Sequence, residues 1–176
     1  MVTKQTIVVI GTGNRGRSIA TRLAGGNFYL LLCDKEFAKS AALATELREL
    51  ITGCDVEAMQ CTFDCAWEAD IIILALDFQE QQEVAAYIRD VVNQKILIGL
   101  VHANDEITSG IASASCQAAA LQVLLPNTKL VNIIYKDSFT DEPVLLTGCH
   151  HPSVEIISEM LDSVGIQSIQ HEQLPA

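Results

Sequence analysis

A glycine-rich segment near the start of the chain constrains the fold more than any other part of the sequence. Residues 6–10 form an apolar run rich in β-branched side chains, and Gly11-Thr12-Gly13-Asn14-Arg15-Gly16 follows directly. Helical spacing then begins, with Ile19 and Leu23 one turn apart, and a second apolar run closes at Asp34. This order of strand, glycine turn, helix and strand predicts a β-α-β unit.

The three glycines have different expected roles in this unit. Gly11 permits the tight turn off the first strand, Gly13 lets the backbone approach a pyrophosphate, and Gly16 lets the helix lie close to the sheet. The exposed amides at the helix start and the positive end of its dipole form an anion site. Asp34 lies 18 residues beyond Gly16, where its carboxylate can accept hydrogen bonds from an adenosine ribose. We therefore predict dinucleotide binding; the alternative is a turn that binds nothing.

Apolar runs and helical spacing alternate along the rest of the chain. We predict helices over residues 36–50, 79–92, 109–124 and 152–164, a short helical turn over 64–69, and strands over 56–61, 70–76, 95–101, 129–135, 143–147 and 166–169. This alternation predicts an α/β fold with a doubly wound, mostly parallel sheet in three α/β/α layers, the Rossmann fold. With 176 residues and no internal repeat or linker, we expect a single dinucleotide-binding domain over residues 1–176.

In such a sheet the ligand lies beyond the carboxyl ends of the strands, where the strand order reverses. Besides the cofactor-binding candidates, this crevice is expected to include Phe78, Ala103, Asn104 and Tyr135. The candidate cofactor-binding residues are Gly11, Thr12, Gly13, Asn14, Arg15, Gly16, Asp34, Lys35, Leu76, Asp77 and His102. His102 is also the candidate catalytic group, because a histidine at a strand end can transfer a proton. The alternative for His102 is a loop histidine with no chemical task.

Other polar residues near strand and helix ends have structural explanations. Asp77 precedes a predicted helix, so we expect it to cap that helix rather than to bind a substrate. His150 and His151 precede Pro152 at another predicted helix start and are expected in the cap region. We expect Tyr135 to be a packed aromatic residue.

Composition and charge exclude several partners and locations. The net charge of −11 opposes non-specific binding to nucleic acid or to an anionic membrane surface. The longest apolar run, residues 71–76, is too short to cross a bilayer, and the first residues lack a secretory signal, so we expect a cytoplasmic protein with reduced cysteines. Cys61, Cys65 and the Cys149-His150-His151 segment lack the CxxC spacing of zinc sites, so we expect no metal.

Several segments resemble those of a known family. Gly11, Gly13, Asn14 and Gly16 match the Gly-x-Gly-Asn-x-Gly motif of small reductases that move hydride between NADP and a deazaflavin coenzyme. The Asp-Ile-Ile-Ile-Leu-Ala run at 70–75 resembles their fourth strand. The chain is also similar to the dinucleotide-binding domains of cytosolic and membrane metalloreductases. The resemblance spans nearly the whole chain and implies hydride transfer between a nicotinamide cofactor and a deazaflavin, flavin-like or other small acceptor.

The sequence also departs from this family's pattern. Ala-Leu-Asp-Phe at 75–78 replaces the family's Ala-Val-Pro and aromatic residue, and Gly-Leu-Val-His-Ala at 99–103 replaces Asp-x-Thr-Asn-Pro. The chain ends at Ala176, where many relatives continue into a helix that helps to close the site and to pair subunits. Two alternatives to an oxidoreductase therefore stay open: a dinucleotide-binding module or sensor without turnover, and a Rossmann-like domain that uses an adenosyl cofactor.

The residues after the second predicted strand bear on cofactor choice. NADP-using relatives commonly place Ser and Arg where this chain has Asp34 and Lys35. A carboxylate repels a 2′-phosphate, and Lys35, with Arg15 and Arg17 near the helix start, offsets only part of that repulsion. Among NAD(P)(H) cofactors we therefore expect NADH to bind more tightly than NADPH. We also expect a homodimer, because a chain this apolar can cover a face by self-association.

Overall fold

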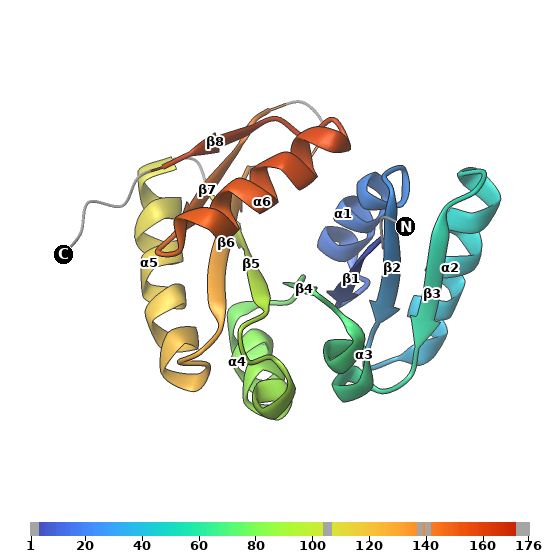
Figure 1. Ribbon diagram of the computed structural model, residues 1–176, viewed down its shortest axis with the longest axis horizontal. Coiled ribbons are helices and arrows are strands. Elements are labelled where there is room, and N and C mark those ends of the chain that lie inside the picture. The colour runs from blue at the N-terminus through green and yellow to red at the C-terminus, as the bar shows by residue number, and fades with distance from the viewer. Residues whose placement is uncertain (1–3, 104–106, 137–138, 140–141, 172–176) are drawn as a thin grey trace.

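Strands and helices alternate along the chain up to β6 (Lys129–Tyr135), and β7 (Val144–Gly148) is the next described element after β6. The computed structural model describes residues 4–103, 107–136, 139 and 142–171 (Figure 1). The strands are β1 (Gln5–Ile10), β2 (Phe28–Cys33), β3 (Asp55–Met59), β4 (Ile71–Leu74), β5 (Ile96–His102), β6 (Lys129–Tyr135), β7 (Val144–Gly148) and β8 (Ser168–Gln170). The helices are α1 (Asn14–Ala24), α2 (Phe37–Leu50), α3 (Thr62–Glu68), α4 (Phe78–Ile88), α5 (Ile107–Leu124) and α6 (His151–Ser163), with a 3₁₀ turn η1 (Arg89–Val91) after α4.

The described strands form one eight-stranded sheet in the order β3-β2-β1-β4-β5-β6-β7-β8. The strands from β1 to β6 pair in parallel, whereas β7 runs antiparallel to β6 and β8 runs parallel to β7. The strand order reverses at β1, which lies between β2 and β4. The predicted doubly wound, mostly parallel sheet is confirmed.

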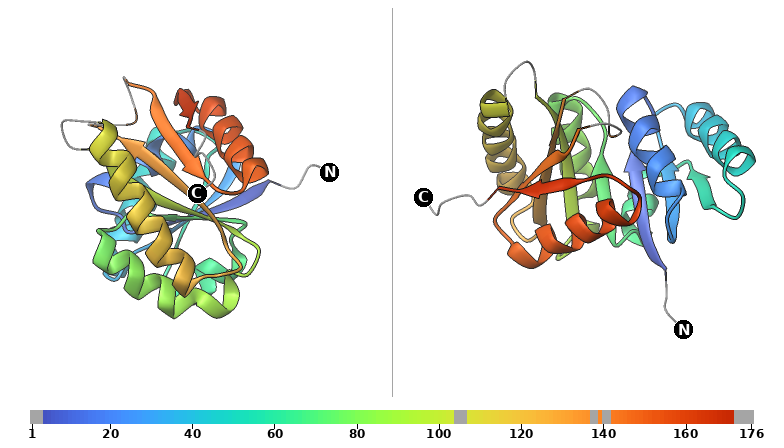
Figure 2. Two further views of the ribbon diagram at one scale, coloured as in Figure 1. Left: turned by 90° about the vertical axis from the view of Figure 1, so that its left-hand side faces the viewer. Right: turned by 90° about the horizontal axis from the view of Figure 1, so that it is seen from above.

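Helices cover both faces of this sheet (Figures 1 and 2). Side chains of α1, α2 and α6 pack on one face, and those of α3, α4 and α5 pack on the other. A strand covered on both faces needs apolar side chains at every position, and all four residues of β4 are buried. That requirement explains why the central strands stand out in the sequence as continuous apolar runs.

Two predicted boundaries shift at the edge of the sheet that faces the crevice. β4 ends at Leu74 rather than at residue 76, because Ala75 and Leu76 leave the sheet and line a cavity. α4 begins at Phe78, where the carboxylate of Asp77 accepts a hydrogen bond from the Glu80 amide at 2.9 Å. The predicted capping role of Asp77 is confirmed.

The last predicted strand also starts later than its apolar sequence indicates. Gly165 has a φ of +76°, and the amide of Ile166 binds the Leu161 carbonyl at 2.9 Å, so these residues close α6. Strand β8 then contains only three residues, and β3, at the other edge of the sheet, contains five. Within the described residues, no helix has the length and apolar character needed to span a membrane.

Candidate functional site

The glycine segment forms a sharp turn between β1 and α1. Gly11 has a φ of +95°, which favours glycine, and its amide binds the Cys33 carbonyl at 2.8 Å. A Cβ atom on Gly16 would lie 1.8 Å from the Gly11 carbonyl oxygen, so only glycine permits this close packing of helix on strand. The expected structural roles of both glycines are confirmed.

Gly13 differs from the other two glycines because its surroundings are open. It is the N-cap residue of α1, and a Cβ atom placed on it would meet nothing within 4 Å. Among the described residues no side chain caps the helix here, and its first turn carries no acidic residue. Uncapped amides at the positive end of a helix, beside open space, fit an anionic pyrophosphate.

A cavity of about 500 Å³ lies beside this turn, at the carboxyl ends of β1, β2 and β4. That volume is within the range of small-molecule sites. Among the predicted cofactor-binding residues, the cavity is lined by Gly11, Gly13, Asn14, Arg15, Asp34, Lys35, Leu76 and Asp77. The topological switch point therefore brings together most of the residues that the sequence predicted for it.

Three predicted residues lie outside the lining of this cavity. Thr12 is buried and binds Asp34, and Gly16 packs α1 against the glycine turn. His102 is exposed at the end of β5, with its ring edge-on to Tyr135 at a centroid distance of 5.4 Å. Asn104, predicted to face the crevice, lies outside the described residues.

Asp34 is held in place by backbone and side-chain donors. Its Oδ2 accepts hydrogen bonds from the amide and the hydroxyl of Thr12, both at 2.7 Å, and its Oδ1 accepts one from the Glu36 amide at 3.0 Å. Burial alone would raise the pKa of Asp34, but the hydrogen bonds from Glu36 and Thr12 outweigh it and lower the pKa. The carboxylate is therefore ionised at neutral pH and has a fixed orientation.

Two lysines line the same end of the cavity, and each has a carboxylate partner. Lys35 Nζ lies 3.0 Å from Glu80 Oε1, and Lys39 Nζ lies 2.6 Å from Glu36 Oε1. Arg17, which the sequence offered as a further cation, instead pairs with Glu46 of α2 at 2.5 Å and does not line the cavity. The positive charge available to a ligand here is therefore already partly neutralised.

Arg15 connects the cavity to aromatic residues at the ends of β5 and β6. Its Nη1 donates to the Leu76 carbonyl at 3.3 Å. Tyr135 is buried and stacks on Phe139 at 4.7 Å, which confirms it as a packed aromatic residue. Burial raises the pKa of Tyr135, while the nearby positive charge of Arg15 opposes that rise.

Sequence reasoning missed several cavity residues that no motif identifies. They are Ile10, Lys39, Thr62, Ala75, Glu80, Glu83 and Val84. Glu80 and Glu83 are one helical turn apart on α4, directly after the Asp77 cap, so an acidic pair at that spacing was the available signal. Within the described residues, no group of three or more His, Cys, Asp or Glu side chains is arranged to hold a metal ion.

Comparison with solved structures reveals proteins with the same fold. A hypothetical protein from Sinorhizobium meliloti superposes with a TM-score of 0.66 at 15% identity, covering 96% of this chain and 84% of that chain. A pyrroline-5-carboxylate reductase from Coxiella burnetii gives a TM-score of 0.69 at 16% identity, covering 97% and 60%. At these identities the likeness establishes the fold alone.

Comparison of sequences goes further than the fold. The F420-dependent NADP reductase of Methanothermobacter thermautotrophicus is 25% identical over 182 residues, which cover 93% of this chain and 78% of that protein. The family model described as NADP oxidoreductase, coenzyme F420-dependent, matches residues 6–103, which include the glycine turn, Asp34 and the strands around the switch point. Since this match covers more than half of the chain, the protein belongs to the family of coenzyme F420-dependent NADP oxidoreductases.

Proposed function

We propose that the protein binds NAD(P)H in the cavity at the switch point and moves hydride between the nicotinamide and a deazaflavin or flavin-like acceptor. One observation carries this proposal: the open, uncapped amides at Gly13 lie beside a cavity of about 500 Å³ that Asp34 also lines. Family membership and the resemblance to the F420-dependent NADP reductase support the reaction class.

The chain's own residues would bind and orient the cofactor. The amides that begin α1 receive the pyrophosphate, and the fixed carboxylate of Asp34 accepts hydrogen bonds from the adenosine ribose. The bound nicotinamide supplies the hydride, so the protein needs no acid or base for that step. His102 and Tyr135, at the neighbouring ends of β5 and β6, are proposed to border the nicotinamide end of the site.

A binding titration followed by a turnover assay tests this function. NADH and NADPH are titrated by fluorescence, with an adenosyl compound as the comparison ligand. Turnover is then measured with coenzyme F420 and with flavin mononucleotide as acceptors. Tight dinucleotide binding with turnover is expected. Binding without turnover on any acceptor would instead indicate a sensor, and preferential binding of the adenosyl compound would overturn the assignment.

We propose further that NADH binds more tightly than NADPH, although the family description names NADP. A 2′-phosphate near Asp34 would face an ionised carboxylate, and at about 4 Å each unit of like charge costs about 4 kcal/mol at an effective dielectric of 20. Lys35 and Lys39 are already paired with Glu80 and Glu36, which weakens their attraction for that phosphate. The dissociation constants of NADH and NADPH, measured at one ionic strength, test this preference. Tighter binding of NADPH would contradict the proposal.

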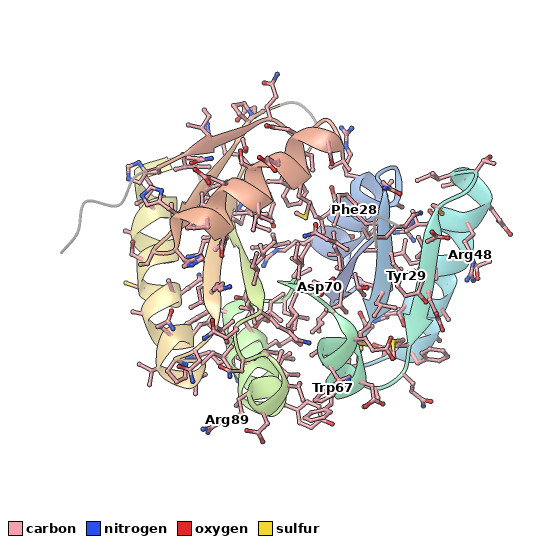
Figure 3. All side chains as sticks on the ribbon, in the orientation of Figure 1. Phe28, Tyr29, Arg48, Trp67, Asp70 and Arg89 are labelled. Atoms are coloured by element: carbon pink, nitrogen blue, oxygen red, sulfur yellow. The ribbon has the colours of Figure 1, made fainter. Side chains whose placement is uncertain are left out.

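The protein is also proposed to associate with a second copy through an aromatic surface on α3 and α4. We call this surface the α3–α4 aromatic patch, and it comprises Phe63, Trp67 and Tyr87. Trp67 and Tyr87 are 66% and 59% exposed, and the ring of Tyr87 lies edge-on to that of Phe63 at a centroid distance of 6.1 Å. Figure 3 shows Trp67 beside α3 at the lower edge of the molecule. Exposed large aromatic residues that cluster are typical of interfaces.

A further inference from the structure

A second and larger cavity lies away from the switch point. It has a volume of about 1140 Å³ and extends along α5 to β7 and the start of α6. It shares no described lining residue with the first cavity, and it reaches the amino end of β6, whereas the first lies at carboxyl ends of parallel strands. The left panel of Figure 2 shows α5 in yellow standing apart from β7 and α6, in orange and red. A ligand here would not occupy the hydride-transfer site.

The charge of this cavity differs from that of the molecule as a whole. The chain has 22 acidic and 11 basic residues, yet no acidic residue is among the described residues that line the cavity. Its lining instead includes Lys129 and three of the four histidines of the chain, His150, His151 and His171. A concave surface that holds lysine and histidine and excludes carboxylates favours an anion.

A buried hydroxyl without a partner provides independent support. Thr147 is 0% exposed and lines the cavity, and its Oγ1 has no hydrogen-bond partner among the described residues. Its register partner Asn132, also buried and in the lining, donates from Nδ2 to the Ala114 carbonyl at 3.2 Å. Buried polar groups are usually satisfied, so the unpaired hydroxyl of this cavity-lining residue favours a ligand that completes its bonding.

One ring nitrogen of His150 is held by the first turn of α6. Its Nδ1 accepts a hydrogen bond from the Ser153 amide at 3.2 Å and caps α6, which confirms its expected place in the cap region. Nδ1 also lies 2.7 Å from Ser153 Oγ, so Nε2 is the ring nitrogen through which His150 would contact a ligand. Within the described residues, the histidines of this cavity belong to no group of three or more side chains that could hold a metal ion.

We propose that this second cavity binds a small molecule carrying at least two negative charges, as carboxylate or phosphate groups. Lys129, His150 and His151 pair with the charges, and the hydroxyl of Thr147 bonds to one of the ligand's oxygens. Apolar residues of α5, among them Ile111 and Ala118, accommodate the carbon body of the ligand. The cavity is large enough for such a molecule. A dinucleotide bound in the first cavity would leave it free for that ligand.

Calorimetric titration of the full chain tests the proposal, with citrate as the carboxylate probe and inorganic pyrophosphate as the phosphate probe. The titrations are made with NADH present and repeated with the Gly13→Val protein, so that the glycine turn is not the anion site being measured. Saturable one-site binding is expected, with Lys129→Gln weakening it about fivefold. Lys4→Gln, which removes an equal charge from an exposed residue outside the cavity, is expected to leave the affinity unchanged.

Thr147→Val provides a second test. A threonine that only supports the fold would not change the affinity for the ligand when it is replaced. The substitution keeps the shape and removes the unpaired hydroxyl, so the unfolding temperature of the ligand-free protein is expected to stay equal or rise. Affinity for the better probe is expected to fall about fivefold. A lowered unfolding temperature with unchanged affinity would show that Thr147 only supports the sheet, and would overturn its assigned role.

Three other results would overturn the site itself. The first is that neither probe binds saturably. The second is that binding vanishes in Gly13→Val yet persists in Lys129→Gln. The third is that Lys4→Gln weakens binding as much as Lys129→Gln does. A dimer that buries the cavity and forms equally with and without the probes would assign this surface to a second copy. The NADH titration reports separately on the proposed oxidoreductase, so failure of one assignment leaves the other measurable.

Discussion

Gly13 and Gly16 lie three residues apart but have opposite surroundings. The position of a Cβ atom on Gly13 is empty, whereas on Gly16 it would lie 1.8 Å from a backbone oxygen. A side chain at Gly13 therefore enters only the space proposed for the pyrophosphate. A side chain at Gly16 pushes α1 off the glycine turn.

Gly13→Val is expected to weaken NAD(P)H binding about 100-fold, equivalent to about 2.7 kcal/mol. The substitution should cost no more than about 1 kcal/mol of folding free energy, because valine is only a poorer N-cap than glycine. Gly16→Ala is the contrasting variant and should lose about 3 kcal/mol of stability by overpacking. Calorimetry and urea unfolding measure the two effects, and unchanged affinity in a folded Gly13→Val protein would refute the assigned site.

Asp34→Ser is expected to shift the ratio of NADPH to NADH affinity about tenfold toward NADPH, after allowance for screening by salt. The reason is that the substitution removes an ionised carboxylate which Thr12 and Glu36 hold at the end of β2. Asp90→Ser changes the charge equally on an exposed residue away from the cavity, and serves as the control. An equal shift in both variants would mean that net charge, not Asp34, sets the ratio.

At the scale of elements, Lys95 connects β5 to the short helix α3. Its Nζ donates to the Ala66 carbonyl at 2.7 Å and to the Trp67 carbonyl, so a cation satisfies the last turn of α3. Burial lowers the pKa of Lys95, and the carboxylate of Asp70 opposes that shift. Without this cap, α3 would end with unpaired carbonyls beside the aromatic patch.

Lys95→Met should therefore reduce the free energy of unfolding by about 1–3 kcal/mol, the cost of leaving charge-assisted acceptors unpaired. Lys4→Met, which breaks an exposed ion pair with Asp55, should cost less than about 1 kcal/mol. Both are measured by urea denaturation at neutral pH. Equal losses in the two proteins would show that the α3 cap contributes nothing special.

The central strands and helices could be predicted from the sequence because each has a local signal. Strand β6 has the predicted bounds, since most of its residues are apolar and all but the first are buried. The glycine turn could be predicted equally well, because a motif of six consecutive residues determines it. By contrast, the antiparallel pairing of β7 with β6 depends on two separate segments of the chain. No local sequence pattern predicts the direction of that pairing.

The residues that line the two cavities are even harder to predict from local sequence patterns. Thr62 and Val84 reach the first cavity from α3 and α4 only because the fold places α3 beside β1 and α4 beside α3. In the second cavity, Lys129, Thr147 and His171 are far apart in the sequence, and no spacing rule connects them. Their proximity follows from strand order, so it becomes visible only in three dimensions.

For the whole molecule, the proposed dimer depends on the α3–α4 aromatic patch. Light scattering of the protein at tens of micromolar, an order of magnitude suited to a weak dimer, should give twice the monomer mass. The double substitution Trp67→Ser and Tyr87→Ser should shift the protein to monomer. Val123→Ser, at an apolar side chain of α5 that is 81% exposed, should leave the dimer intact. A monomeric unmodified protein would remove the dimer proposal.

The shortness of β8 and the acidic residues of β3 have a consequence for how concentrated protein behaves. β8 offers three residues for pairing, and β3 carries Asp55 and Glu57, so two β3 edges that met would bring like charges together. Such edge strands are poor partners for hydrogen bonding with a further strand. Copies of the folded chain are therefore expected to meet through their helices, and crowded solutions should stay free of cross-β fibrils.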